Sequence, residues 1–217
     1  MAQVFVGLFA EGKTDYRFLS GITEKALTAA AFECPGQIDL EILPIQIDKA
    51  GLSFPQQVTE AARVGRDRFA IHALMVHTDA DHTDARRAYE QKILPAEEAL
   101  QECGEEGICS ILIPIVPVQA VEAWMLADLD LLRSEIGATL GNEKLGLHRL
   151  PESIAQPKEV IKEALRIQHS TGTRRRGKPL TLAELYLPLG QALEITKLER
   201  LPSFRDFHQK IRHAFRE

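Results

Sequence analysis

Uniformly apolar runs alternate with helical patterns over the first 133 residues of the chain. Runs of this kind are typical of strands that are buried on both faces. The four runs are QVFVGLFA (3–10), LEILPIQI (40–47), AIHALMVH (70–77) and SILIPIVPV (110–118). The helical patterns that follow them lie near 14–32, 54–68, 83–103 and 119–133. This alternation predicts right-handed crossovers and an α/β fold, with a four-stranded, mainly parallel sheet and helices on both faces.

Beyond residue 133 the strand signal disappears. The stretch LGNEKLGLHRLPESIAQP has the glycines and prolines of a linker, and three helical patterns follow it. These patterns lie near 157–169, 181–192 and 203–215, and HSTGTRRRGKP (169–179) interrupts them. We therefore predict an α/β domain over 1–133 and a helical C-terminal extension over 134–217 that packs on it.

Composition is that of an ordinary globular protein. The chain has 217 residues, of which 45% are apolar and 26% are charged, enough to bury a sizeable core. No window reaches the roughly 18 apolar residues of a membrane span, and the N-terminus lacks a basic, apolar leader. We therefore expect a cytoplasmic protein without a membrane partner. The three cysteines form no C-x-x-C pair, which argues against a structural zinc site.

Charge is unevenly distributed along the chain. Residues 158–217 hold 13 Lys and Arg against 7 Asp and Glu, a net charge of +6, whereas residues 1–157 have a net charge of −11. A basic segment beside an acidic body is a pattern found in proteins that bind polyanions, although a solvated helical face would look the same. The residues that we expect to contact nucleic-acid phosphates are Arg174, Arg175, Arg176 and Lys178.

Acidic residues follow three of the four predicted strands. Because the carboxyl ends of parallel strands meet at one edge of a sheet, these side chains should converge there. Carboxylates repel one another unless water or a cation separates them. If solvation were the only explanation, acidic residues would also be found at the opposite edge of the sheet. The residues are Glu11 and Asp15 after the first strand, Asp79 and Asp81 after the third, and Glu122 after the fourth. The pattern predicts a cation site.

The stretch GLFAEGKT (7–14) supports a different hypothesis. It matches the P-loop expression G-x-x-x-x-G-K-[ST], and VHTD would then supply a Walker B aspartate, so a P-loop NTPase or kinase is an alternative function. Leu8, Phe9 and Ala10 continue the apolar strand, however, instead of forming a loop around phosphates. The P-loop also leaves Asp15 and Glu122 unexplained.

Several motifs resemble one family of proteins. FAEGKTDYRFL resembles the E-G-x-T-[DE] opening of Toprim-like domains, and HTDAD resembles their D-x-D motif. Over most of the chain, VPVQAVEAWMLAD, QPKEVI and PSFRDF resemble an uncharacterised bacterial Toprim-related family. That family is similar to the Toprim nuclease domain of the overcoming-lysogenisation-defect (OLD) proteins.

This resemblance implies a function and a set of site residues. The function is hydrolysis of phosphodiester bonds in nucleic acid, with Mg²⁺ or Mn²⁺ as the cofactor, since hard cations prefer carboxylate ligands. The implied metal ligands are Glu11, Asp15, Asp79, Asp81 and Glu122, and the implied catalytic residues are Glu11 with Lys158 or Lys178. Expected partners are nucleic acid, an ATPase protein and a second copy in a homodimer. Because the nuclease relatives carry an ATPase domain that this sequence lacks, a non-catalytic partner of an ATPase is a competing hypothesis.

Overall fold

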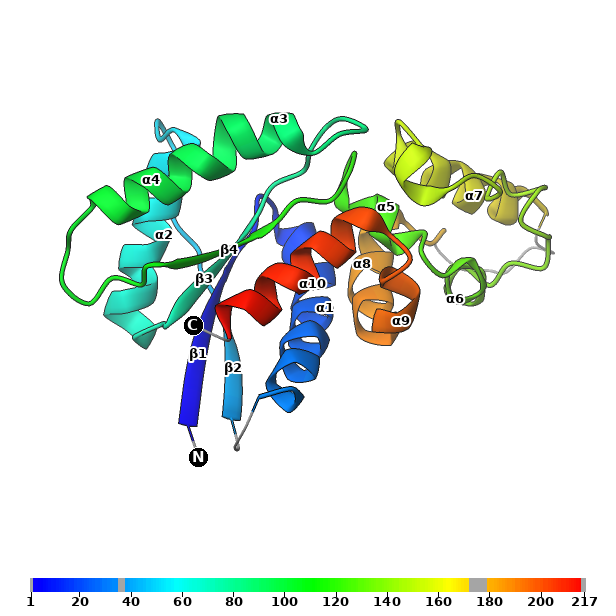
Figure 1. Cartoon of the computed structure of the whole chain (residues 1–217). Coiled ribbons are helices and arrows are strands. Elements are labelled where there is room, and N and C mark those ends of the chain that lie inside the picture. The colour runs from blue at the N-terminus through cyan, green and yellow to red at the C-terminus, as the bar shows by residue number, and fades with distance from the viewer. Residues whose placement is uncertain (1, 35–37, 172–178, 216–217) are drawn as a thin grey trace.

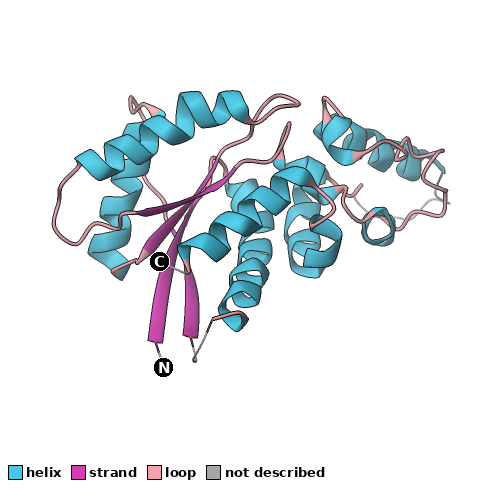
Figure 2. Ribbon diagram, in the orientation of Figure 1, coloured by secondary structure: helices cyan, strands magenta, loops and turns pink. Residues whose placement is uncertain are grey.

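One four-stranded sheet forms the centre of the protein (Figures 1 and 2). The computed structural model describes residues 2–34, 38–171 and 179–215. The strands are β1 (Ala2–Phe9), β2 (Ile38–Pro44), β3 (Ala73–His77) and β4 (Ile111–Ile115). They lie in the order β2-β1-β3-β4, and every neighbouring pair is parallel. The predicted α/β fold class is confirmed.

Helices pack on both faces of the sheet, but the edge strand β2 is less buried than its apolar run predicted, since none of its residues is fully buried. Helices α1 (Lys13–Phe32) and α10 (Pro202–Ala214) pack on one face. Helices α2 (Phe54–Phe69) and α4 (Leu94–Glu102) pack on the other. In β3, for example, Met75 belongs to the first core cluster and its neighbour Leu74 to the second, because successive strand residues point to opposite faces.

The path of the chain creates a switch point between β1 and β3. The chain leaves β1 through α1 toward the edge strand β2, and it leaves β3 in the opposite direction toward β4. Helices α1 and α4, which make these two connections, cover opposite faces of the sheet. In open α/β sheets, ligands bind at the carboxyl ends of the strands beside such a point.

Two of the predicted helices are broken in the structure. The stretch near 83–103 contains a short helix α3 (Arg86–Ala88), a π-helical turn (Tyr89–Ile93) and then α4. The stretch near 119–133 divides into α5 (Val121–Met125) and α6 (Leu129–Glu135). The second break occurs because Asp128 Oδ1 accepts hydrogen bonds from the backbone N–H groups of Asp130 and Leu131, which starts a new helix.

The segment after residue 134 shares a core with the sheet. It contains α7 (Pro157–Thr171), α8 (Leu182–Ala192) and α9 (Ile195–Leu198) before α10, and a 3₁₀ turn at Pro151–Ser153 precedes α7. Trp124 of α5 is fully buried against Phe204 and Phe207 of α10, and its Nε1 donates to Ser203 Oγ over 2.8 Å. These contacts bind the end of the chain to the helix that follows β4.

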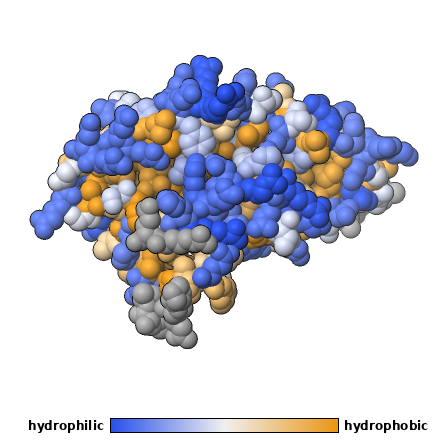
Figure 3. All heavy atoms as spheres, viewed as in Figure 1, coloured by the Kyte–Doolittle hydropathy of each residue, from blue (hydrophilic) through white to orange (hydrophobic). Residues whose placement is uncertain are grey.

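The face in Figure 3 is mainly hydrophilic, with smaller apolar areas between the hydrophilic ones. Within the described residues, no helix is long and apolar enough to cross a bilayer.

Helices α1 and α8 approach each other closely through two glycines. A β-carbon at Gly190 would lie 2.3 Å from the carbonyl oxygen of Phe18, and one at Gly21 would lie 2.6 Å from the carbonyl oxygen of Gly190. Lys25 then donates hydrogen bonds to three carbonyl groups at the end of α8, those of Gly190, Gln191 and Leu193. The glycines therefore set how near α8 lies to α1.

We expect Gly190→Ala to destabilise the protein by about 1–3 kcal/mol, because the added methyl group meets backbone atoms that cannot turn aside. The matched control is Gly141→Ala, since a β-carbon at Gly141 meets nothing within 4 Å. The control should unfold at the same urea concentration as the wild type or a higher one. Equal stability of the two variants in urea titrations would show that the helices can separate without cost.

Candidate functional site

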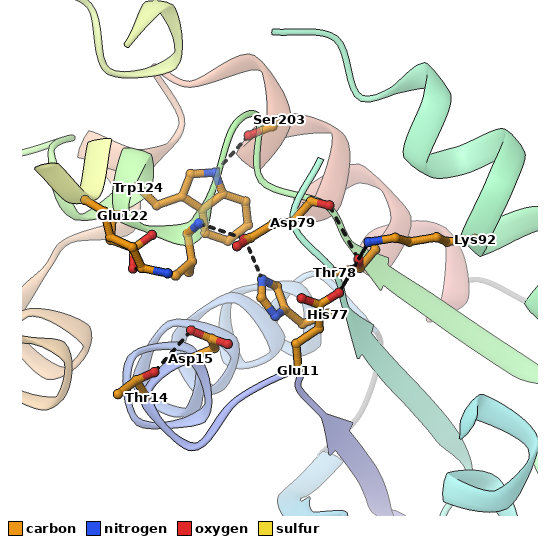
Figure 4. A network of polar contacts seen from close by, with 12 residues as sticks. Glu11, Thr14, Asp15, His77, Thr78, Asp79, Lys92, Glu122, Trp124 and Ser203 are labelled. Carbon is orange, nitrogen blue, oxygen red and sulfur yellow. Dashed lines mark hydrogen bonds and ion pairs between the residues drawn. The ribbon is translucent and has the colours of Figure 1, made fainter. Parts of the chain in front are cut away.

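Glu11 and Thr78 join the ends of β1 and β3 across the switch point. Thr78 Oγ1 donates a hydrogen bond to Glu11 Oε1 over 2.6 Å (Figure 4). Lys92 from the π-helical turn donates to Thr78 Oγ1 over 2.6 Å, and its Nζ lies 3.4 Å from Glu11 Oε1. π-helical turns are frequent at functional sites, so the position of Lys92 in such a turn supports a functional role for this part of the protein. The sequence motifs gave no indication of this lysine.

Asp79 lies between the end of β3 and the start of α5. Its Oδ1 accepts a hydrogen bond from the backbone N–H of Val121 over 2.9 Å and lies 3.2 Å from Nε2 of His77. His77 is fully buried. Burial lowers the pKa of His77, but the hydrogen bond to Asp79 and the charges of Asp79, Asp15 and Glu11 outweigh it and raise the pKa above its usual value. The neighbouring carboxylates therefore shift the histidine toward its protonated form.

Glu122 is the most deeply buried carboxylate of the site. Its side chain is 0% exposed, and the Tyr186 hydroxyl of α8 donates a hydrogen bond to its Oε1. Lys158 of α7 lies 3.3 Å from the same oxygen. Burial lowers the pKa of Lys158, but the charge of Glu122 and its hydrogen bond raise it overall. Among the described residues, Glu122 Oε2 has no hydrogen-bond partner.

Asp15 reaches the site from the first turn of α1. It is 9% exposed, and Thr14 Oγ1 lies 3.5 Å from its Oδ1. A β-carbon at Gly12 would lie 2.9 Å from Asp15 Oδ2, so glycine at this position lets the carboxylate lie against the loop. In the EGKTD motif, the absence of a side chain at Gly12 therefore leaves the space that the Asp15 carboxylate occupies.

The two aspartates of the D-x-D motif lie in different environments. The Asp79 side chain is largely buried, whereas Asp81 is exposed and adopts a φ of 54°. The Asp81 N–H donates to the carbonyl oxygen of Gln119, which itself has a φ of 62°. Positive φ at residues other than glycine costs free energy and is common at functional sites. This pairing joins the loops that follow β3 and β4.

The structure brings half of the predicted site residues to one edge of the sheet. Figure 4 shows Glu11, Asp15, Asp79 and Glu122 around the ends of β1 and β3, and Lys158 contacts Glu122. Within 2–34, 38–171 and 179–215, no group of three or more His, Cys, Asp or Glu side chains is arranged to hold a metal ion as it stands. The predicted residues that lie outside the described part of the chain are Arg174, Arg175, Arg176 and Lys178.

The P-loop expression falls on a different local structure. Gly7, Leu8 and Phe9 form the end of β1, where they pair with β2 and β3. A β-carbon at Gly7 would lie 2.9 Å from side-chain atoms of Ile71 and Leu74, so this glycine allows close packing inside the sheet. The backbone of these residues therefore belongs to a strand and not to a loop around phosphates.

Fold and site together define an α/β protein with a carboxylate cluster at the switch point of a parallel sheet. The family model for the domain of unknown function DUF4276 matches residues 10–212, so the chain belongs to this uncharacterised family. Searches of curated proteins and of solved structures found no match.

We expect Tyr186→Phe to destabilise the protein by about 1.5–3 kcal/mol at pH 7, because Glu122 loses the hydrogen bond that compensates for its burial. The loss should be smaller in a Glu122→Gln background, where the acceptor is neutral. Tyr16→Phe is the matched control, since no hydrogen bond of the Tyr16 hydroxyl occurs in the described structure. A double-mutant cycle in urea measures this coupling, and a coupling of zero would contradict the assigned hydrogen bond.

Proposed function

We propose that the protein hydrolyses phosphodiester bonds in nucleic acid with the help of a divalent cation. The observation that carries this proposal is the convergence of Glu11, Asp15, Asp79 and Glu122 at the switch point, with Lys158 and Lys92 among them. Carboxylates from three separate connections meet where a parallel sheet binds its ligands. Such a site suits a substrate that is itself an anion only if a cation lies between the two.

The oxygen donors of the site are of the kind that Mg²⁺ and Mn²⁺ prefer, although the described side chains do not form a preassembled set of ligands. Both ions prefer oxygen ligands, and Glu122 Oε2 is a buried carboxylate oxygen that has no partner in the described structure. The ligands would be Asp15, Asp79 and Glu122, with Glu11 and the exposed Asp81 at the border of the site. When bound, the cation would polarise a phosphoryl oxygen and stabilise the charge that develops on it.

The side chains of the protein supply the remaining chemistry. Lys158 lies between solvent and Glu122, and its side chain is 50% exposed, so its ammonium group can also bind an oxygen of the substrate phosphate. Glu11 is 41% exposed and is oriented by Thr78 and Lys92. In this proposal Glu11 accepts the proton of the attacking water. Lys92 holds the Glu11 carboxylate in position and is therefore a positioning residue.

Sequence motifs support the same function. The E-G-x-T-D and D-x-D motifs resemble those of Toprim domains and of the OLD nucleases, and the first includes Glu11 and Asp15 while the second includes Asp79 and Asp81. The basic charge of residues 158–217 suits a nucleic-acid substrate, because phosphate contacts supply much of the affinity for such a polymer.

We expect Asp79→Asn to abolish cleavage of DNA or RNA that occurs in Mg²⁺ or Mn²⁺ and stops in EDTA. Asp39→Asn, on the edge strand β2, is the matched control and should cleave at the wild-type rate. The measurement is gel analysis of labelled single- and double-stranded substrates. Metal binding by the wild type without turnover of any substrate would instead favour the non-catalytic partner of an ATPase.

Lysine substitutions separate the proposed hydrolase from a P-loop NTPase. Lys158→Ala should lower kcat by about 10- to 1,000-fold, because one cation that stabilises transition-state charge is lost. Lys13→Ala is the control, since Lys13 is exposed at the start of α1 and should affect cleavage only modestly. ATP affinity, measured by calorimetry, should be negligible in both variants and in the wild type. If the wild type binds ATP and Lys13→Ala does not, the P-loop NTPase or kinase becomes the favoured function.

A further inference from the structure

A pocket of about 600 Å³ lies beside the acidic cluster, between the start of α1 and the helices α7 and α8. Its volume is in the range of pockets that bind small organic ligands. Part of its wall is apolar and comes from Leu165, Leu182 and Ala183. Three residues of α7 also line it: Lys162 and Arg166, which bring positive charge, and His169.

Two lining residues connect the pocket to the proposed active site. Thr14 lines the pocket, and its hydroxyl lies 3.5 Å from Asp15 Oδ1. Tyr186 also lines it, and its hydroxyl donates to Glu122. A ligand that fills the pocket would therefore end beside the carboxylates, separated from them by one layer of side chains.

The basic residues of α7 form a continuous row. Lys158, Lys162, Arg166 and His169 follow one another at spacings of four, four and three, which places them on one face of the helix. Lys158 contacts Glu122, and the other three line the pocket. The row thus leads from the acidic cluster along the pocket.

Their present partners do not prevent these side chains from binding phosphate. Lys162 pairs with Glu159 and Arg166 with Glu163, and all four side chains are about half exposed or more. Exposed pairs of this kind contribute little free energy. Arg166 in particular can exchange its carboxylate for a phosphate with the same bidentate geometry.

We infer that the pocket binds the base of one nucleotide of the substrate strand, with its sugar and the adjoining phosphates on the basic row of α7. The apolar wall suits a nucleobase, the cations suit its phosphates, and the connection through Thr14 and Tyr186 sets the nucleotide beside the carboxylates. This inference rests on the proposed function and names the part of the substrate that the site would recognise.

The test compares two substitutions on the same helix. Ala183→Phe fills the pocket, whereas Leu187→Phe changes an exposed residue of α8 that does not line it. The probes are deoxyadenosine 5′-monophosphate and deoxyribose 5-phosphate, titrated by calorimetry in Ca²⁺. We expect Ala183→Phe to weaken the nucleotide at least 10-fold and to leave the sugar phosphate unchanged. Leu187→Phe should change neither affinity.

Two outcomes would contradict the inference about the pocket and leave the proposed function intact. In the first, Ala183→Phe binds the nucleotide as tightly as the wild type; in the second, the wild type cleaves nucleic acid but does not bind the nucleotide. If the wild type binds the nucleotide but cleaves no nucleic acid, and Ala183→Phe abolishes the binding, the inference about the pocket holds and the proposed hydrolase function is contradicted. Thermal unfolding checks that the variant folds. If Ala183→Phe is unfolded, Ala183→Leu fills less of the pocket, and a loss of at least threefold is then expected.

Discussion

The burial of one charged group, the Glu122 carboxylate, determines how the parts of this protein are joined. A charge removed from water costs several kcal/mol unless a partner with good geometry compensates for it. Here the partners are Tyr186 and Lys158, which come from α8 and α7, whereas Glu122 follows β4. The α/β part therefore needs the C-terminal helices to satisfy its own carboxylate. The close crossing of α8 on α1 at Gly190 in turn keeps Tyr186 within reach.

The other carboxylates are stabilised by shorter-range contacts. Glu11 has Thr78 and Lys92, and Asp79 has a backbone N–H and the buried His77. These contacts reduce the repulsion between like charges and keep the carboxylates in one place. At the site they leave two of the five unpaired buried side-chain atoms of the described structure, Glu122 Oε2 and His77 Nδ1. Because buried polar atoms are normally paired, such atoms at a convergent site indicate where a ligand would complete the structure.

The sequence predicted the sheet well because its signal is local. Uniformly apolar runs mark strands that are buried on both faces, and acidic residues after parallel strands must meet at one edge. Lys92 and Tyr186 could not be found in this way, since their contacts with Thr78 and Glu122 depend on packing between segments 14 and 64 residues apart. Asp81 was expected to bind metal together with Asp79, and this stays a prediction; what the sequence did not indicate is that backbone pairing with the loop after β4 holds Asp81 in a left-handed conformation with an exposed side chain.

Helix α7 gives the basic segment a geometry that net charge alone did not provide. From Lys158 to Arg166 the helix rises about 12 Å, and it presents a cation at each turn along this length. A strand laid along α7 would therefore meet positive charge repeatedly while one of its phosphates lies beside Glu122. Long-range attraction of this kind is independent of base sequence. Any preference for particular nucleotides would then have to arise in the pocket, where the apolar wall would contact a single base of the proposed substrate.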